Sequence, residues 1–160
     1  MTVNRVQLAL NVADLDAAVD FYRRMFGVQV HKRRPGYANF AIADPPLKLV
    51  LFEAPNAPQQ LNHLGVEVAS PEGVALVADR FGRAGLTTRT SEQELCCHAV
   101  QDKVYVHAPD VPLGHWEFYT IVDDDPAEAI ADDAAQCCHT DGEDSVCCAT
   151  VGADLNPSAA

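Results

Sequence analysis

The sequence contains no apolar run that approaches the roughly 20 residues of a transmembrane helix, and its N-terminus lacks the basic and then apolar segment of a secretory signal. It also contains no isolated cysteine, because all six cysteines occur as adjacent pairs. In a reducing cytosol, cysteines are more often ligands of metals or metalloids than partners in disulfides. We therefore expect a cytoplasmic protein with no membrane partner and with thiol ligands.

Basic residues are missing from the C-terminal part of the chain. Residues 1–122 contain 13 acidic and 11 basic residues, a net charge of −2, whereas residues 123–160 contain 10 acidic residues and no Lys or Arg, which gives −10 of the total −12. The first part therefore has no basic patch for a nucleic acid. We expect one domain over 1–122, followed by an acidic and largely disordered tail over 123–160.

The first half of the domain has the pattern of a strand, a helix and three more strands. Residues 6–12 alternate between apolar and polar side chains, as a half-buried strand does. Asp14 is a candidate helix N-cap, apolar residues then recur at helical spacing, and Gly27 is the predicted stop. Three strand-like runs follow, at 28–32, 37–42 and 47–52.

The same pattern then repeats. Residues 62–68 resemble the first strand at an offset of 56, Ser70 and Pro71 open a second helix, and Gly85 ends it. Strand-like runs follow at 87–90, 103–107 and 115–121. The duplication predicts an α+β fold with two tandem βαβββ modules, about residues 3–54 and 61–122. We expect them to form one curved mixed sheet around a metal-binding cup, with the helices outside.

Strand parity places three potential metal ligands on the cup face. Val6, Leu8, Leu10 and Val12 form the apolar set that should pack against a helix, which turns Gln7 toward the cup. His63 occupies the equivalent position of the second module, and Glu117 on the last strand can point to the same place. An amide, an imidazole and a carboxylate leave coordination positions open, which suits Fe(II), Mn(II), Co(II) or Ni(II). Each residue taken singly is more often a solvated strand residue, but their convergence favours a metal site.

Cys96 and Cys97 are the second candidate site. Their Cα atoms lie about 3.8 Å apart, below the roughly 4.4 Å usual for a disulfide, so the two thiolates are better suited to chelate As(III), Cd(II) or Zn(II). The surrounding segment 89–102 is polar and is predicted to be a long loop, where capture residues are expected. The alternative is a pair of small buried apolar residues. His98 either lowers the pKa of a thiol or is an ordinary surface histidine.

Several residues are weaker candidates. His115 shares strand parity with Glu117 and is expected to support the ligands, and Tyr119 is expected to face the cup. The remaining cysteines either help to capture metalloids or are dispensable; they are Cys137, Cys138, Cys147 and Cys148.

The duplicated frame, with the segment Asn11-Val12-Ala13-Asp14-Leu15-Asp16-Ala17-Ala18-Val19-Asp20-Phe21-Tyr22 after its first strand, resembles the vicinal-oxygen-chelate superfamily. That superfamily includes glyoxalases, extradiol dioxygenases and fosfomycin- and bleomycin-resistance proteins. The resemblance covers about residues 3–122 and maps the metal positions of the family to Gln7, Val50, His63 and Glu117. Val50 is apolar where a glyoxalase has a carboxylate, which argues against glyoxalase activity, and Glu53 could replace it only through a register shift.

The metal ligands together with Cys96 and Cys97 look like those of the carbon–arsenic lyases of this superfamily. The resemblance implies an Fe(II)-dependent dioxygenase that uses O2 to cleave trivalent organoarsenicals, methylarsenite and reduced aromatic arsenicals, to inorganic arsenite in detoxification. Cys96 and Cys97 would be the catalytic pair that captures the substrate. The alternatives are a non-catalytic, thiol-based heavy-metal (Cd or As) resistance protein of the cadmium-induced type, and an extradiol-type dioxygenase. Either a monomer or a homodimer fits the duplication.

Overall fold

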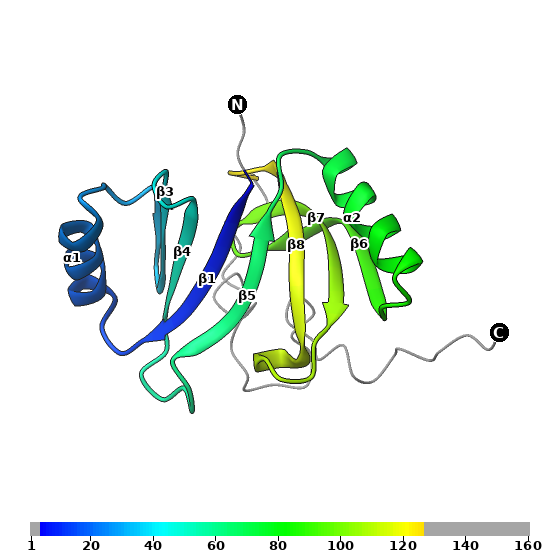
Figure 1. Ribbon diagram of the computed structural model, residues 1–160. Coiled ribbons are helices and arrows are strands. Elements are labelled where there is room, and N and C mark those ends of the chain that lie inside the picture. The colour runs from blue at the N-terminus through cyan, green and yellow to red at the C-terminus, as the bar shows by residue number, and fades with distance from the viewer. Residues whose placement is uncertain (1–3, 127–160) are drawn as a thin grey trace.

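The computed structural model describes residues 4–126, which form two modules of the same element order. The first module comprises β1 (Arg5–Val12), α1 (Leu15–Phe26), β2 (Lys32–Arg34), β3 (Tyr37–Ile42) and β4 (Leu47–Glu53). The second comprises β5 (Leu61–Glu67), α2 (Pro71–Arg83), β6 (Thr88–Cys96), β7 (Ala99–His107), a 3₁₀ turn (Pro112–Gly114) and β8 (His115–Asp123). Figure 1 shows the two modules side by side, with α1 and α2 at opposite ends.

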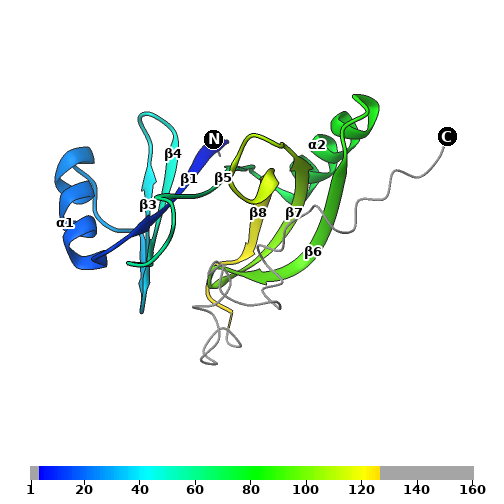
Figure 2. The same cartoon turned by 90° about the horizontal axis from the view of Figure 1, so that it is seen from below.

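All eight strands belong to one mixed sheet in the order β2-β3-β4-β1-β5-β8-β7-β6. β1 and β5 pair antiparallel and join the modules, while β1 runs parallel to β4 and β5 runs parallel to β8. Seen from below, the two halves of the sheet form facing walls, with one helix outside each wall (Figure 2). The predicted α+β fold with tandem βαβββ modules is confirmed.

Both helices begin and end where the sequence indicates. The Asp14 side chain accepts a hydrogen bond from the backbone N–H of Ala17 at 2.9 Å, and Gly27 ends α1 with a φ of 66°. Ser70 accepts from Gly73 N–H at 3.3 Å at the start of α2, and Gly85 follows that helix with a φ of 70°. Each cap satisfies backbone groups that the helix itself leaves without partners.

Each helix buries an apolar stripe against the outer face of its own module. Leu15 and Val19 of α1 pack on β3 and β4, and Val74 and Phe81 of α2 pack on Val104 and its neighbours. The helices therefore leave the cup face of the sheet uncovered. No helix among residues 4–126 is long and apolar enough to cross a membrane.

Some predictions about local structure were wrong. Residues 89–102 are not a long loop but two paired strands, β6 and β7, and only Cys97 and His98 lie between them. β6 is the edge strand of the sheet, so its outer side chains meet water and its sequence is as polar as that of a loop. Residues 28–31 form no strand. Val6 is 47 % exposed and is not covered by α1, which packs on Leu8, Leu10 and Val12.

Candidate functional site

Three neighbouring strands align the predicted metal ligands in the cup. Gln7 on β1 lies opposite Gly65 on β5, and Gly65 lies beside Glu117 on β8. Because Gly65 has no side chain, the side chains of Gln7 and Glu117 meet across it. His63 lies two residues before Gly65 and therefore faces the same side of the sheet. All three predicted ligands are at most 5 % exposed.

The polar ends of these three side chains converge on one point. Gln7 Nε2 lies 2.8 Å from His63 Nε2 and 2.9 Å from Glu117 Oε1, and His63 Nε2 lies 3.2 Å from Glu117 Oε1. Two donor atoms at right angles on one divalent ion, each about 2.1 Å from it, would lie about 3.0 Å apart. Within residues 4–126 no three His, Cys, Asp or Glu side chains are grouped to hold a metal ion, so the third donor here is an amide. The spacing of these three atoms suits a divalent ion once the Gln7 amide is turned so that its oxygen takes the place of Nε2.

His63 is held in the orientation that a metal ligand requires. Its Nδ1 lies 2.6 Å from Asn62 Oδ1, so Nδ1 carries the proton and the lone pair of Nε2 accepts from Gln7 Nε2. Asn62 is in turn fixed by donating from Nδ2 to Asn11 Oδ1 at 2.9 Å. Such partners behind a ligating histidine set its ring orientation and its tautomer.

Tyr119 fixes the orientation of the Gln7 amide. The Tyr119 hydroxyl donates to Gln7 Oε1 and also lies 3.4 Å from Glu67 Oε2, and the Tyr119 side chain is almost fully buried. For Gln7 to present its oxygen to an ion, the amide must turn over. The hydroxyl of Tyr119 can then accept from Gln7 Nε2 while it donates to Glu67, because a phenol can do both. Tyr119 therefore faces the cup, as its strand parity predicts.

Lys103 keeps Glu117 ionised. Lys103 Nζ donates to Glu117 Oε2 at 3.2 Å, and it lies 3.6 Å from Glu94 Oε1. Burial by itself would raise the pKa of Glu117, but the charge of Lys103, together with the contact with His63, outweighs it and lowers the pKa to about 2. The carboxylate is therefore available as an anionic ligand at neutral pH.

Gly65 leaves the space in which Glu117 stands. A Cβ atom at position 65 would lie 2.9 Å from Glu117 Cγ and 3.0 Å from the Glu117 carbonyl oxygen. We expect Gly65→Ala to displace Glu117 and to weaken iron binding by about tenfold or more, as changes behind a metal ligand do. Equilibrium dialysis against Fe(II) under anaerobic conditions measures this. The control is Gly82→Ala, since a Cβ there meets nothing within 4 Å; equal iron affinity of the two variants would contradict the prediction.

Cys96 and Cys97 lie at the tip of the hairpin formed by β6 and β7. Cys96 pairs with Ala99, and the two residues between them have positive φ values, 52° at Cys97 and 66° at His98, the pattern of a type I′ turn. Neither residue is glycine, so this backbone is strained, and such strain is concentrated at functional sites. The two sulfurs lie 3.3 Å apart. Two thiolates each about 2.3 Å from one ion lie at most about 4.6 Å apart, so both can bind one soft centre.

The cation beside Cys96 is Lys103 and not His98. Burial favours the neutral form of Lys103, but the nearby charges of Cys96 and Glu117 raise its pKa well above the ordinary value, so it stays positive. Burial, together with the charge of Lys32, lowers the pKa of His98, and its ring packs on Tyr37 at 5.1 Å. A neutral His98 cannot favour a thiolate by its charge. His98 is half-buried and is not an ordinary surface residue.

One residue of the thiol pair and two of the three predicted metal ligands line one cavity of about 20 Å³, roughly the space of one water molecule. Cys97, Gln7 and Glu117 all line it. Lys32 closes this region by donating to the His98 carbonyl at 3.1 Å and to Asp124 Oδ1 at 2.7 Å. The hairpin tip is thus held against the cup.

The other predicted residues are placed as follows. His115 is buried beside Tyr105, and its Nδ1 lies 3.0 Å from the Leu113 carbonyl; burial lowers its pKa. Val50 is buried in an apolar cluster, and Glu53 accepts from the Leu15 N–H at the start of α1, so it does not reach the cup. The four tail cysteines lie outside the described residues; they are Cys137, Cys138, Cys147 and Cys148.

Sequence reasoning missed Lys103, Asn62 and the role of Gly65. A signal for Lys103 is present, because a lysine at the cup-facing parity of a buried strand needs an anionic partner. Its partner Glu117 could not be identified before the pairing of β7 with β8 was known.

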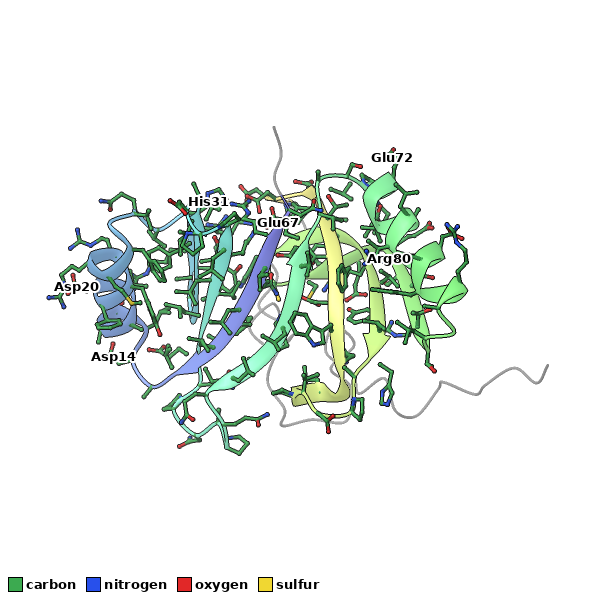
Figure 3. All side chains as sticks on the ribbon, in the orientation of Figure 1. Asp14, Asp20, His31, Glu67, Glu72 and Arg80 are labelled. Atoms are coloured by element: carbon green, nitrogen blue, oxygen red, sulfur yellow. The ribbon has the colours of Figure 1, made fainter. Side chains whose placement is uncertain are left out.

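Glu67 links the two modules beside the site, where β5 adjoins β1 (Figure 3). It accepts from Arg5 at 2.8 Å and lies 3.3 Å from Lys48 Nζ. Burial alone would raise the pKa of Glu67, but Lys48 and Arg5 lower it below 4.5, so its stabilising effect is complete above pH 4.5 and is lost as the pH falls through the pKa of the folded state.

We expect Glu67→Gln to lower the free energy of unfolding by about 2 kcal/mol at neutral pH. This difference should shrink as the pH falls through the lowered pKa of the folded state, because the wild-type side chain then becomes neutral as well. Urea unfolding over a pH series tests this, with Asp79→Asn, which removes an exposed ion pair of α2, as the control with little effect. A difference between Glu67→Gln and wild type that does not change with pH would contradict the prediction.

Comparison with known proteins gives close relatives. The chain is 50 % identical over 146 residues to a protein named cadmium-induced protein CadI of Mycobacterium tuberculosis, covering 91 % of this chain and 93 % of that protein. It is 48 % identical over 153 residues to a trivalent organoarsenical cleaving enzyme of Thermomonospora curvata, covering 95 % of this chain and 99 % of the other.

Solved structures and a family model agree with the fold. The structure of homoprotocatechuate 2,3-dioxygenase from Arthrobacter globiformis matches with a TM-score of 0.51 at 21 % identity, covering 76 % of this chain and 37 % of the other, a likeness of fold alone. Residues 4–110 match the family model described as the Glyoxalase/Bleomycin resistance protein/Dioxygenase superfamily.

Proposed function

Because the chain belongs to the glyoxalase/bleomycin resistance protein/dioxygenase superfamily, we propose that it is an Fe(II)-dependent dioxygenase that cleaves the carbon–arsenic bond of trivalent organoarsenicals. Its substrates would be methylarsenite and reduced aromatic arsenicals, and inorganic arsenite would be a product, which makes the reaction a detoxification. The observation that carries this proposal is that Cys97, Gln7 and Glu117 line one cavity. The name of the 48 % identical relative supports the same activity.

The three converging donors would hold the metal. Gln7, His63 and Glu117 supply one amide oxygen, one imidazole nitrogen and one carboxylate, a set that also accepts Mn(II), Co(II) or Ni(II). Fe(II), when bound, would supply the activation of dioxygen. Asn62 and Tyr119 keep His63 and Gln7 aimed into the cup, and the buried walls exclude bulk water.

The thiol pair would bind and orient the substrate. Trivalent arsenic is a soft centre, so it prefers the sulfurs of Cys96 and Cys97 to the oxygen and nitrogen ligands of the cup. Lys103, whose positive charge interacts with Cys96, is placed to balance the negative charge of a thiolate that binds arsenic. Because the hairpin tip lies at the same cavity as Gln7 and Glu117, capture brings the carbon–arsenic bond toward the metal ligands. The reducing cytoplasm, where we expect the protein, would keep both thiols reduced.

A second candidate is thiol-based sequestration of a heavy metal such as Cd(II) without catalysis. The name of the 50 % identical relative favours it, and the sulfurs of Cys96 and Cys97 would serve that role equally well. A sequestering protein, however, has no use for a convergent set of nitrogen and oxygen donors behind the thiol pair.

Arsenic speciation distinguishes the two functions. The full chain is loaded with Fe(II) without oxygen, methylarsenite is added, air is admitted, and the arsenic species are separated and quantified. The proposal expects inorganic arsenite to appear only when iron and oxygen are both present. Methylarsenite that stays bound and is recovered unchanged would refute the lyase and favour sequestration.

A further inference from the structure

Asn39 is a buried amide in a strand that is otherwise apolar or aromatic. It lies on β3, opposite Lys32 of β2 and Val50 of β4, and it is 2 % exposed. Its Nδ2 donates to the Tyr37 hydroxyl at 2.7 Å. Its Oδ1 is buried and has no hydrogen-bond partner among residues 4–126. A buried carbonyl oxygen left in this way is destabilising, so such groups call for an explanation.

Asn39 lines the cavity that Cys97 also lines. Among residues 4–126, two other buried side-chain polar atoms have no partner, Arg5 Nε and Arg89 Nη2. Neither of these residues lines this cavity. Lys48 also lines this cavity, and its Nζ is already paired with Glu67 at 3.3 Å. Asn39 Oδ1 is therefore the one buried polar side-chain atom without a hydrogen-bond partner on the described residues that line this cavity.

The surroundings of Asn39 suit the organic group of a substrate. Ala9, Tyr37, Val50 and Phe52 form a buried apolar cluster, and Cys97 packs against it. The rings of Tyr37 and Phe52 lie 5.5 Å apart. An arsenic atom held by Cys97 would carry its organic group onto this apolar and aromatic surface, where an aryl ring can bury its faces. The cavity has room for about one water molecule, so an aryl group must displace lining side chains as it enters.

We infer that Asn39 is a specificity-determining residue whose Oδ1 accepts a hydrogen bond from a hydroxyl or amino substituent on the aryl group of an arsenical held by Cys96 and Cys97. The inference rests on the proposed function, and it ranks hydroxyaryl and aminoaryl arsenicals above phenylarsenite. One neutral hydrogen bond to an otherwise unpaired buried oxygen corresponds to about tenfold in affinity.

The test compares phenylarsenite with 3-hydroxyphenylarsenite and 4-hydroxyphenylarsenite. Binding is measured by equilibrium dialysis on the iron-loaded full chain without oxygen, so that no turnover occurs. The four cysteines of the tail are replaced by serine, which leaves Cys96 and Cys97 as the one thiol pair. We expect the better hydroxyphenyl isomer to bind about tenfold more tightly than phenylarsenite.

Two substitutions at Asn39 isolate the oxygen. Asn39→Leu should weaken binding of the hydroxyphenyl compound about tenfold and leave binding of phenylarsenite unchanged, which removes the preference. Asn39→Asp keeps an acceptor oxygen and should retain the preference. Equal binding of the three compounds to the wild-type site overturns the inference, as does an equal loss for all three in Asn39→Leu. If Asn39→Leu does not fold, the wild-type ratio and Asn39→Asp still decide.

The outcome separates this inference from the proposed function. A binding preference without release of arsenite after air is admitted would support the role of Asn39 and refute the lyase. Release of arsenite with no preference among the three compounds would refute the role of Asn39 alone.

Discussion

Glu117→Ala is expected to lose bound iron and turnover while the hairpin thiols still bind one trivalent arsenical. Glu117 is the one carboxylate of the three-donor set, it is 5 % exposed, and its pKa of about 2 keeps it anionic at neutral pH. Removing it leaves a neutral amide and an imidazole, so we expect the iron content to fall at least about tenfold. Iron is quantified after anaerobic reconstitution, and methylarsenite is titrated against the thiols of the same sample.

The stability of the fold must be separated from the loss of the ligand. In Glu117→Ala, Lys103 and His63 lose the buried carboxylate that they contact. Breaking a buried ion pair by removing one partner lowers the free energy of unfolding by about 3–5 kcal/mol. Glu117→Gln preserves the size of the side chain and serves as the second variant. The matched control is Glu94→Gln, because Glu94 also lies near Lys103, at 3.6 Å, but is not one of the three donors. Iron retained at the wild-type level in both Glu117 variants would remove Glu117 from the ligand set.

Cys96→Ser and Cys97→Ser are each expected to weaken methylarsenite binding at the hairpin by about 100-fold or more, with the iron content unchanged. The sulfurs lie 3.3 Å apart, so the second arsenic–sulfur bond forms within one molecule and adds the large affinity gain of a bivalent contact. A single remaining thiol cannot form the second arsenic–sulfur bond, so this gain in affinity is lost. The three proposed metal ligands belong to β1, β5 and β8, which the hairpin substitutions do not alter.

The measurement requires that no other thiol pair competes. Binding is therefore compared in a chain whose four tail cysteines are serine, and that chain with Cys96 and Cys97 intact is the reference. Because Cys96 is 1 % exposed and a serine hydroxyl there would be buried, Cys96→Ala accompanies Cys96→Ser as a check on folding. Normal turnover in either cysteine variant would refute the capture role.

Local signals in the sequence were sufficient for most of the fold. Asp14, Gly27 and Ser70 mark helix ends because caps depend on side chains within a few residues, and the structure has all three where they are predicted. The repeat at an offset of 56 predicts the duplicated element order, which the structure confirms. The polar edge strand β6 was mistaken for a loop, because exposure on one face gives a strand and a loop similar compositions.

The sequence by itself therefore determined the tandem βαβββ order and the faces of β1, β5 and β8, since both follow from periodicities of two or about four residues. It also predicted that the side chains of Gln7, His63 and Glu117 face the cup. Only the tertiary structure decided how far apart their donor atoms lie, because those distances depend on the register of β1, β5 and β8. The same holds for Lys103 beside Glu117 and for Asn39 at the cavity that Cys97 lines. Contacts between residues so distant along the chain depend on strand pairing and packing, which no local pattern records.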